Sequence, residues 1–73
     1  MKDGLDFAKA ILKELSSTFP SKDSIPFIMI SPSGGLMFNF EAKEARHAFE
    51  LSEDDLSKSP ELIVSEVKSD LSL

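Results

Sequence analysis

Apolar residues near the start of the chain recur with the three-to-four-residue period of a helix, at Leu5, Ala8, Ile11, Leu12, Leu15 and Phe19. Lysines and polar residues fall on the opposite face, as in a helix that covers a core on one side only. Asp3 is a suitable N-cap because its carboxylate can accept from free backbone N–H groups. Pro20 excludes the preceding residue from the helical region. The pattern therefore predicts a helix that begins at Asp3 and ends before Pro20.

The pattern changes after a polar loop at residues 21–24. Residues 25–30 read Ile-Pro-Phe-Ile-Met-Ile, a short β-branched and aromatic run that predicts a strand, with Pro26 near its start or on an edge. Residues 31–35, Ser-Pro-Ser-Gly-Gly, predict a turn, since proline presets one central residue and glycine accepts the positive φ that follows. Residues 36–42 alternate apolar and mixed positions and predict the second strand of a hairpin.

Residues 41–51 allow two interpretations. The run Glu-Ala-Lys-Glu-Ala-Arg-His-Ala is rich in helix formers and places Ala42, Ala45 and Phe49 on one helical face. Alternatively, residues 42–45 form a turn and residues 46–52 a third strand, with His47, Phe49 and Leu51 on one side. The strand buries larger side chains, and a hairpin of two strands alone is marginal. The strand is preferred, and the helix stays open as the alternative.

The end of the chain predicts a second helix after an acidic connector at residues 52–55, with Leu56 turned inward. Ser59 is a suitable N-cap, Pro60 suits the first helical position, and Glu61 suits the first turn. The apolar face of this helix consists of Ile63, Val64, Val67 and Leu71.

These elements define an α+β fold in the order α-β-β-β-α. We expect a small single domain over residues 1–73, with a three-stranded antiparallel meander and two helices packed on one face. Such a small core supports a free energy of unfolding of about 5 kcal/mol. Because the chain has no cysteine, disulfides and thiolate zinc sites are excluded. With these excluded, a second copy of the chain or another protein is the remaining source of additional stability for the fold.

The charge pattern narrows the class of partner. The net charge is −5, and the eight basic residues are scattered, which disfavours direct binding to nucleic acid or to anionic membrane. No apolar run approaches the length of a membrane span. Acidic residues and lysines interrupt the first residues, unlike a signal peptide, so the expected location is the cytoplasm.

Candidate chemistry is sparse. His47 is the only histidine, and the spacing of the nearby glutamates defines no catalytic group around it, so we expect a sheet histidine at the rim or beside Phe49. Residues 33–35 join two strands and lack the lysine of a phosphate-binding loop. Residues 53–55 lack the alternating acids and glycine of a calcium loop. We predict no enzyme activity, no catalytic residue, no cofactor and no metal.

The run at residues 25–30 is apolar on both of its faces, which is unexpected for a sheet covered on one side only. Its outward side chains, joined by Met37, would form an exposed patch of the kind that marks an interface. We therefore predict a non-enzymatic protein-binding or regulatory domain that acts through the apolar sheet face or this strand's edge, with a homodimer as one form. The predicted interface residues are Phe27, Ile28, Met29, Ile30 and Met37, with Arg46 and Glu50 as rim charges.

Two competing interpretations remain. In the first, a helix or the C-terminal tail wraps round the sheet and buries both faces. In the second, the protein is an acidic inhibitor of the phage anti-defence type, which imitates nucleic-acid phosphates and blocks a nucleic-acid-binding enzyme. The acids that would dominate such binding are Glu41, Glu50, Glu53 and Asp54.

Overall fold

The computed structural model of this chain describes residues 4–73, so the predicted N-cap Asp3 lies outside the described residues. The elements are α1 (Gly4–Thr18), β1 (Phe27–Ile30), β2 (Leu36–Ala42), β3 (Ala45–Glu50), a 3-10 turn η1 (Asp54–Ser57) and α2 (Pro60–Asp70). This order confirms the predicted α-β-β-β-α arrangement.

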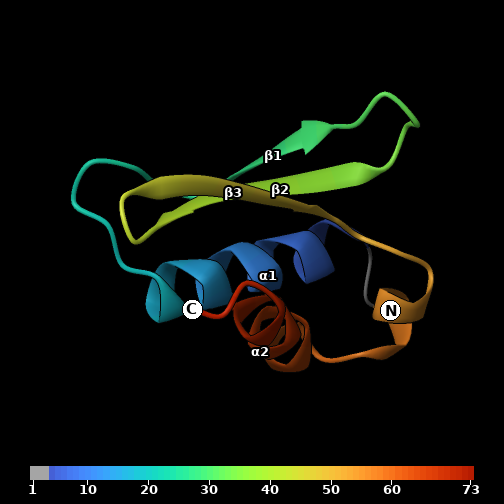
Figure 1. The fold of residues 1–73 in the computed structure, drawn as a ribbon. Coiled ribbons are helices and arrows are strands. Elements are labelled where there is room, and N and C mark those ends of the chain that lie inside the picture. Colours follow the sequence, from blue (N-terminus) through green and yellow to red (C-terminus); the bar gives the residue numbers. More distant parts are fainter. Residues whose placement is uncertain (1–3) are drawn as a thin grey trace.

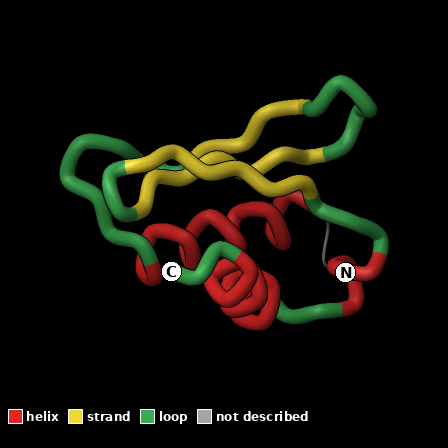
Figure 2. Tube along the Cα trace, in the orientation of Figure 1, coloured by secondary structure: helices red, strands yellow, loops and turns green. Residues whose placement is uncertain are grey.

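The molecule has two layers. The strands form an antiparallel sheet in the order β1-β2-β3, and both helices lie against the same face of it (Figure 1). Figure 2 shows the same separation, with the two helices on one side of the strands. The fully buried side chains come from both layers: Ile11, Leu15, Phe38, Phe40, Ile63 and Val64. The core therefore lies between the sheet and the helices, and the sheet has a second face that neither helix covers.

The helices begin and end largely where capping chemistry predicts. The last helical bond before Pro20 runs from the Phe19 N–H to the Leu15 carbonyl at 2.9 Å. At the start of α2 the Ser59 hydroxyl accepts from the Leu62 N–H at 3.1 Å, with Pro60 at the first helical position. The prediction for Leu71 was wrong, because this residue is the exposed C-cap of α2.

The first hairpin follows its turn residues. The Gly34 N–H donates to the Ser31 carbonyl at 2.8 Å, and Gly34 has a φ of 89°, a conformation in which a side chain would be strained. Strand β1 starts at Phe27, two residues later than predicted. Pro26, which precedes it, has no N–H to contribute to the sheet.

The strand interpretation of residues 41–51 is confirmed, and the helix alternative is wrong. Strand β3 begins one residue earlier than predicted and ends at Glu50 instead of Ser52. Its Phe49 ring stacks on Phe38 with centroids 5.3 Å apart. This contact between strands outweighs the local preference of the sequence for helix, because propensity is worth only tenths of a kcal/mol per residue.

The β2–β3 connection is a strained two-residue turn. Ala42 pairs directly with Ala45, and the residues between them, Lys43 and Glu44, both have positive φ, at 51° and 62°. Such turns favour asparagine and glycine, since the left-handed conformation disfavours residues that carry a Cβ.

We expect Glu44→Gly to raise the free energy of unfolding by about 0.5–1 kcal/mol, because glycine removes the Cβ strain but has a more flexible unfolded state. Urea unfolding followed by circular dichroism measures the change. The control is Lys13→Gly, at an exposed position within α1, where the same residue type should destabilise by about 1 kcal/mol. A less stable Glu44→Gly variant would contradict the strained-turn assignment.

Candidate functional site

The face of the sheet opposite the helices, called the outer face below, carries an apolar cluster. The strand register sets Met29 against Met37 and Phe27 against Asn39. On β2, Met37 and Asn39 flank Phe38, whose side chain is fully buried on the helix side, so their own side chains project from the outer face. The side chains of their partners on β1, Met29 and Phe27, project from the same face. Phe27, Met29 and Met37 therefore lie together as the structure's candidate binding surface.

The cluster is accessible. Phe27 is 40% exposed and Met29 51% exposed, while Met37 is half-buried on the central strand. Within residues 4–73 no helix or tail lies over these side chains, and the terminal Leu73 packs against the core cluster instead. The wrapping alternative is therefore not the arrangement of the described residues.

The other two predicted apolar interface residues project from the opposite side of β1. Ile28 pairs with Phe38 and packs against the core cluster, so it contributes to the fold. Ile30 pairs with Leu36 on the same side, yet it is 67% exposed because it lies at the end of an edge strand. The predicted set thus divides between the two faces of the sheet.

The two predicted rim charges lie at opposite ends of β3. The guanidinium carbon of Arg46 is 5.5 Å from the centre of the Phe27 ring, a cation–π distance. At the other end, the Glu50 carboxylate accepts from the Ser33 hydroxyl at 2.9 Å. A Cβ at Gly35 would overlap this carboxylate, so the flexible Glu50 side chain would have to move to accommodate one. The cluster therefore has one charge of each sign beside it.

Sequence reasoning missed Asn39 as part of this surface. Asn39 lies between Phe27 and Ala48 in the register, on the outer face, yet it is only 7% exposed. Its Nδ2 atom is buried and has no hydrogen-bond partner among residues 4–73. Buried polar groups are nearly always bonded, so this amide is energetically unfavourable for the isolated chain. Alternation along β2 predicts the direction of the side chain, but its burial depends on the neighbouring strands.

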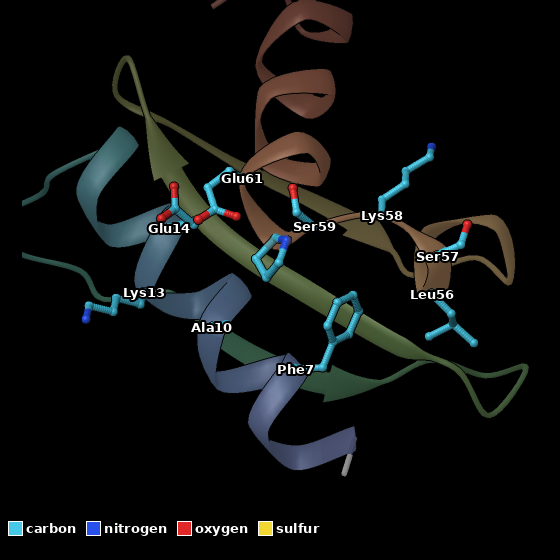
Figure 3. Close-up of a pocket in the computed structure, with 10 residues that line it drawn as sticks. Phe7, Ala10, Lys13, Glu14, Leu56, Ser57, Lys58, Ser59 and Glu61 are labelled. Atoms are coloured by element: carbon cyan, nitrogen blue, oxygen red, sulfur yellow. The ribbon is translucent and has the colours of Figure 1, made fainter. Parts of the chain in front are cut away.

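An open groove on the helix side of the molecule is the second candidate site (Figure 3). It has a volume of about 650 Å³ and is lined by residues of α1, by the end of η1 and by the start of α2. Phe7 and Leu56 supply apolar surface, and the side chains of Lys13 and Lys58 point outward from it. The prediction that Leu56 turns inward was wrong, because it is 64% exposed at this groove.

The polar groups beside the groove hold the connector in place. The Ser52 N–H donates to the Asp55 carboxylate at 2.9 Å, and the Lys58 ammonium bridges Asp55 at 3.4 Å and Glu66 at 2.8 Å. Burial by itself raises the pKa of Asp55, but the hydrogen bonds from Ser52 and Lys58 outweigh it and hold that pKa below its ordinary value. The hydrogen bond to Glu66 raises the pKa of Lys58. These charges serve the fold of the connector, and we assign no binding role to the groove.

His47 is a structural residue of the sheet. Its Nε2 atom lies 3.2 Å from the Ala42 carbonyl oxygen, and its ring stacks on Phe40 with centroids 5.4 Å apart. The prediction was a sheet histidine at the rim or beside Phe49; the register sets His47 directly against Phe40, whose ring also lies 6.3 Å from that of Phe49. Among residues 4–73, no group of three or more histidine, aspartate or glutamate side chains is arranged to hold a metal ion.

Comparison with known proteins adds no constraint on function. No protein-family model, curated protein or solved structure matches the chain. None of the helices within residues 4–73 has both the length and the apolar character to cross a bilayer. Inference about function therefore rests on the surface of the chain itself.

Proposed function

We propose that this chain is a non-enzymatic protein-binding domain whose binding surface consists of the apolar outer-face cluster and the adjacent edge of β1. The observation that carries the proposal is the position of Phe27, Met29 and Met37 together on a face that neither helix covers. Exposed apolar side chains scattered singly are common, whereas a contiguous group marks an interaction site.

The distribution of charge supports the same surface. Residues 24–40, which include β1 and most of β2, contain no charged side chain, although 29% of the whole chain is charged. The centres of protein interfaces are depleted of charge and enriched in methionine and aromatic residues, with polar groups at the rim. Arg46 and Glu50 are in the position of rim charges. The flexible thioethers of Met29 and Met37 can adapt to the shape of a partner.

The proposed partner is another protein in the cytoplasm, and a second copy of the chain is one such partner. The lack of cysteine supports that compartment. The competing acidic inhibitor has no comparable structural support. Two of the acids named for it accept hydrogen bonds from serine hydroxyls, Glu41 from Ser21 at 3.1 Å and Glu50 from Ser33 at 2.9 Å.

Capture from an extract of the native host tests this proposal through Met29→Lys, which places a charge in the centre of the cluster. The wild-type chain is expected to retain specific proteins at high salt, because apolar contacts are not screened by ions. Met29→Lys should lose them. Leu62→Lys is the matched control, since Leu62 is 46% exposed on α2 in the other layer, and it should capture the same proteins.

Two results would contradict the proposal. Equal capture by Met29→Lys and the wild type would mean that the outer-face cluster is not the binding surface. Capture that disappears at high salt would indicate that the acidic residues carry the binding instead. Circular dichroism of each variant confirms that the fold is retained.

A further inference from the structure

Among residues 4–73, strand β1 borders the sheet and pairs with β2 on one side only. The Ser31 N–H donates to the Gly35 carbonyl at 2.8 Å, so the backbone groups of Ser31 point toward β2. Backbone groups alternate in direction along an antiparallel strand, so those of Met29 point toward β2. The N–H and C=O groups of Ile28 and Ile30 therefore point away from the sheet. They form a short template for another strand.

The side chains of β1 indicate contact at its edge. Met29 is exposed on the outer face, and its neighbour Ile30 is more exposed on the helix side. A partner that lay flat on the outer face would cover Met29 but leave Ile30 in water. A strand added to the edge of β1 reaches side chains on both faces, since successive side chains of a strand point in opposite directions.

The two edges of the sheet differ in protection. Soluble proteins protect exposed sheet edges with charged side chains, among other devices. Strand β3, at one border, carries Arg46 and Glu50 and follows the charged turn residues Lys43 and Glu44. Strand β1, at the other border, carries no charge, and Pro26 lies before its first residue. The edge without charged side chains is therefore β1, a short strand that Pro26 precedes.

The net charge of the chain bears on where a second copy could bind. Two copies, each with a net charge of −5, repel one another least when they meet where neither carries acids. Residues 24–40 provide that neutral surface. Antiparallel pairing of identical strands is also self-complementary about a two-fold axis, so one edge supplies both halves of the interface. We infer that β1 pairs with β1 of a second copy and joins two three-stranded sheets into one continuous sheet.

The register of this pairing follows from the backbone. A two-fold axis through Met29 sets Ile28 against Ile30 of the second copy, so that all of their outward backbone groups can bond. An axis through Ile28 would set Ile30 against Pro26, which has no N–H to donate. The first register is therefore the one we expect. This inference rests on the proposed function. It adds to that function a specific partner, the strand edge where the partner binds and the register of the two strands.

Hydrogen exchange of the wild-type chain tests the pairing directly, together with sedimentation over a range of concentrations. We expect a weak dimer, because the paired strands are short and the buried area is small. As the dimer forms, the amides of Ile28 and Ile30 should become slower to exchange. The amide of Met29, which bonds within the sheet, should be protected at every concentration.

A pair of variants at one position isolates the backbone contribution. Ile30→Pro removes an N–H that points away from β2, so the β1–β2 ladder stays intact. It should weaken dimerisation about tenfold or more, because the N–H is lost from both copies and two hydrogen bonds across the interface disappear. Ile30→Val keeps the N–H and the branched side chain and should dimerise like the wild type.

The outcomes separate this inference from the proposed function. A chain that stays monomeric at the highest concentration overturns the pairing, as does a dimer in which the Ile28 and Ile30 amides exchange as in the monomer. Equal dimerisation by Ile30→Pro and Ile30→Val overturns it as well. If the wild type is monomeric and Met29→Lys still abolishes capture of a foreign protein, the pairing fails and the proposed function stands.

Discussion

Replacing Phe38 with alanine should remove most of the free energy of unfolding and shift the urea midpoint far below that of the wild type. Phe38 is fully buried on the central strand and stacks on Phe49 at 5.3 Å. Truncating a buried phenylalanine to alanine lowers the free energy of unfolding by about 3–5 kcal/mol. A domain of this size has only about 5 kcal/mol in total. Far-ultraviolet circular dichroism and urea unfolding at 25 °C, conditions at which the wild type is folded, would show the loss.

Phe27→Ala provides the matched control for this experiment. It makes the same chemical change on the neighbouring strand, but on the outer face, where the ring is already 40% exposed. We expect it to cost about 1 kcal/mol or less and to keep a cooperative transition. If both variants unfold to the same extent, the assignment of the core to the helix side of the sheet is wrong.

Replacing Asn39 with valine should make the protein more stable, by about 1–2 kcal/mol. The buried Nδ2 atom of Asn39 has lost its contact with water and has no partner in the described part of the chain, a penalty of about 1–3 kcal/mol. Valine removes that penalty and suits a central strand. Thermal unfolding of the two proteins at equal concentration measures the difference.

Asn39→Asp is the control for this second prediction, since it keeps the shape of the side chain and adds a buried charge. It should destabilise the protein, because a carboxylate at this 7% exposed position loses most of its hydration. A lower stability for Asn39→Val would mean that the amide has a favourable partner in solution, such as an ordered water.

Much of the fold could be predicted from the sequence because its signals are local. The apolar period that includes Ile11 and Leu15 defines α1, and the Ser59-Pro60 pair starts α2 at the expected residue. The first hairpin follows from Pro32 and Gly34, whose backbone preferences are intrinsic to the residue.

Other features could not be predicted because they depend on distant contacts. Residues 41–51 contain helix formers, and the stacking of Phe49 on Phe38 decides their structure. The Lys43-Glu44 turn carries neither of the residues that signal its type. Leu56 was predicted inward from its apolar character, yet it lies at an open groove beside a connector fixed by polar bonds.

The candidate binding surface was predicted in part. Alternation along residues 25–30 separates Met29 from Ile28, but it cannot say which of the two faces the helices cover. That choice depends on the packing of α1 and α2, which the structure supplies. The burial of Asn39 likewise requires β1 and β3 to lie on both sides of it. The sequence therefore pointed to the segment that carries part of the outer-face cluster, but it combined the two faces of that segment into one site.

The unequal protection of the two sheet borders limits how large an assembly can become. A sheet with two open borders can add copies at both ends and grow into a filament, as edge-exposed sheets do in aggregates. Here Arg46 and Glu50 lie on the β3 border, so growth has one available direction. Once two copies pair through β1 as proposed, no neutral border is left within the described strands, and the assembly ends as a closed pair.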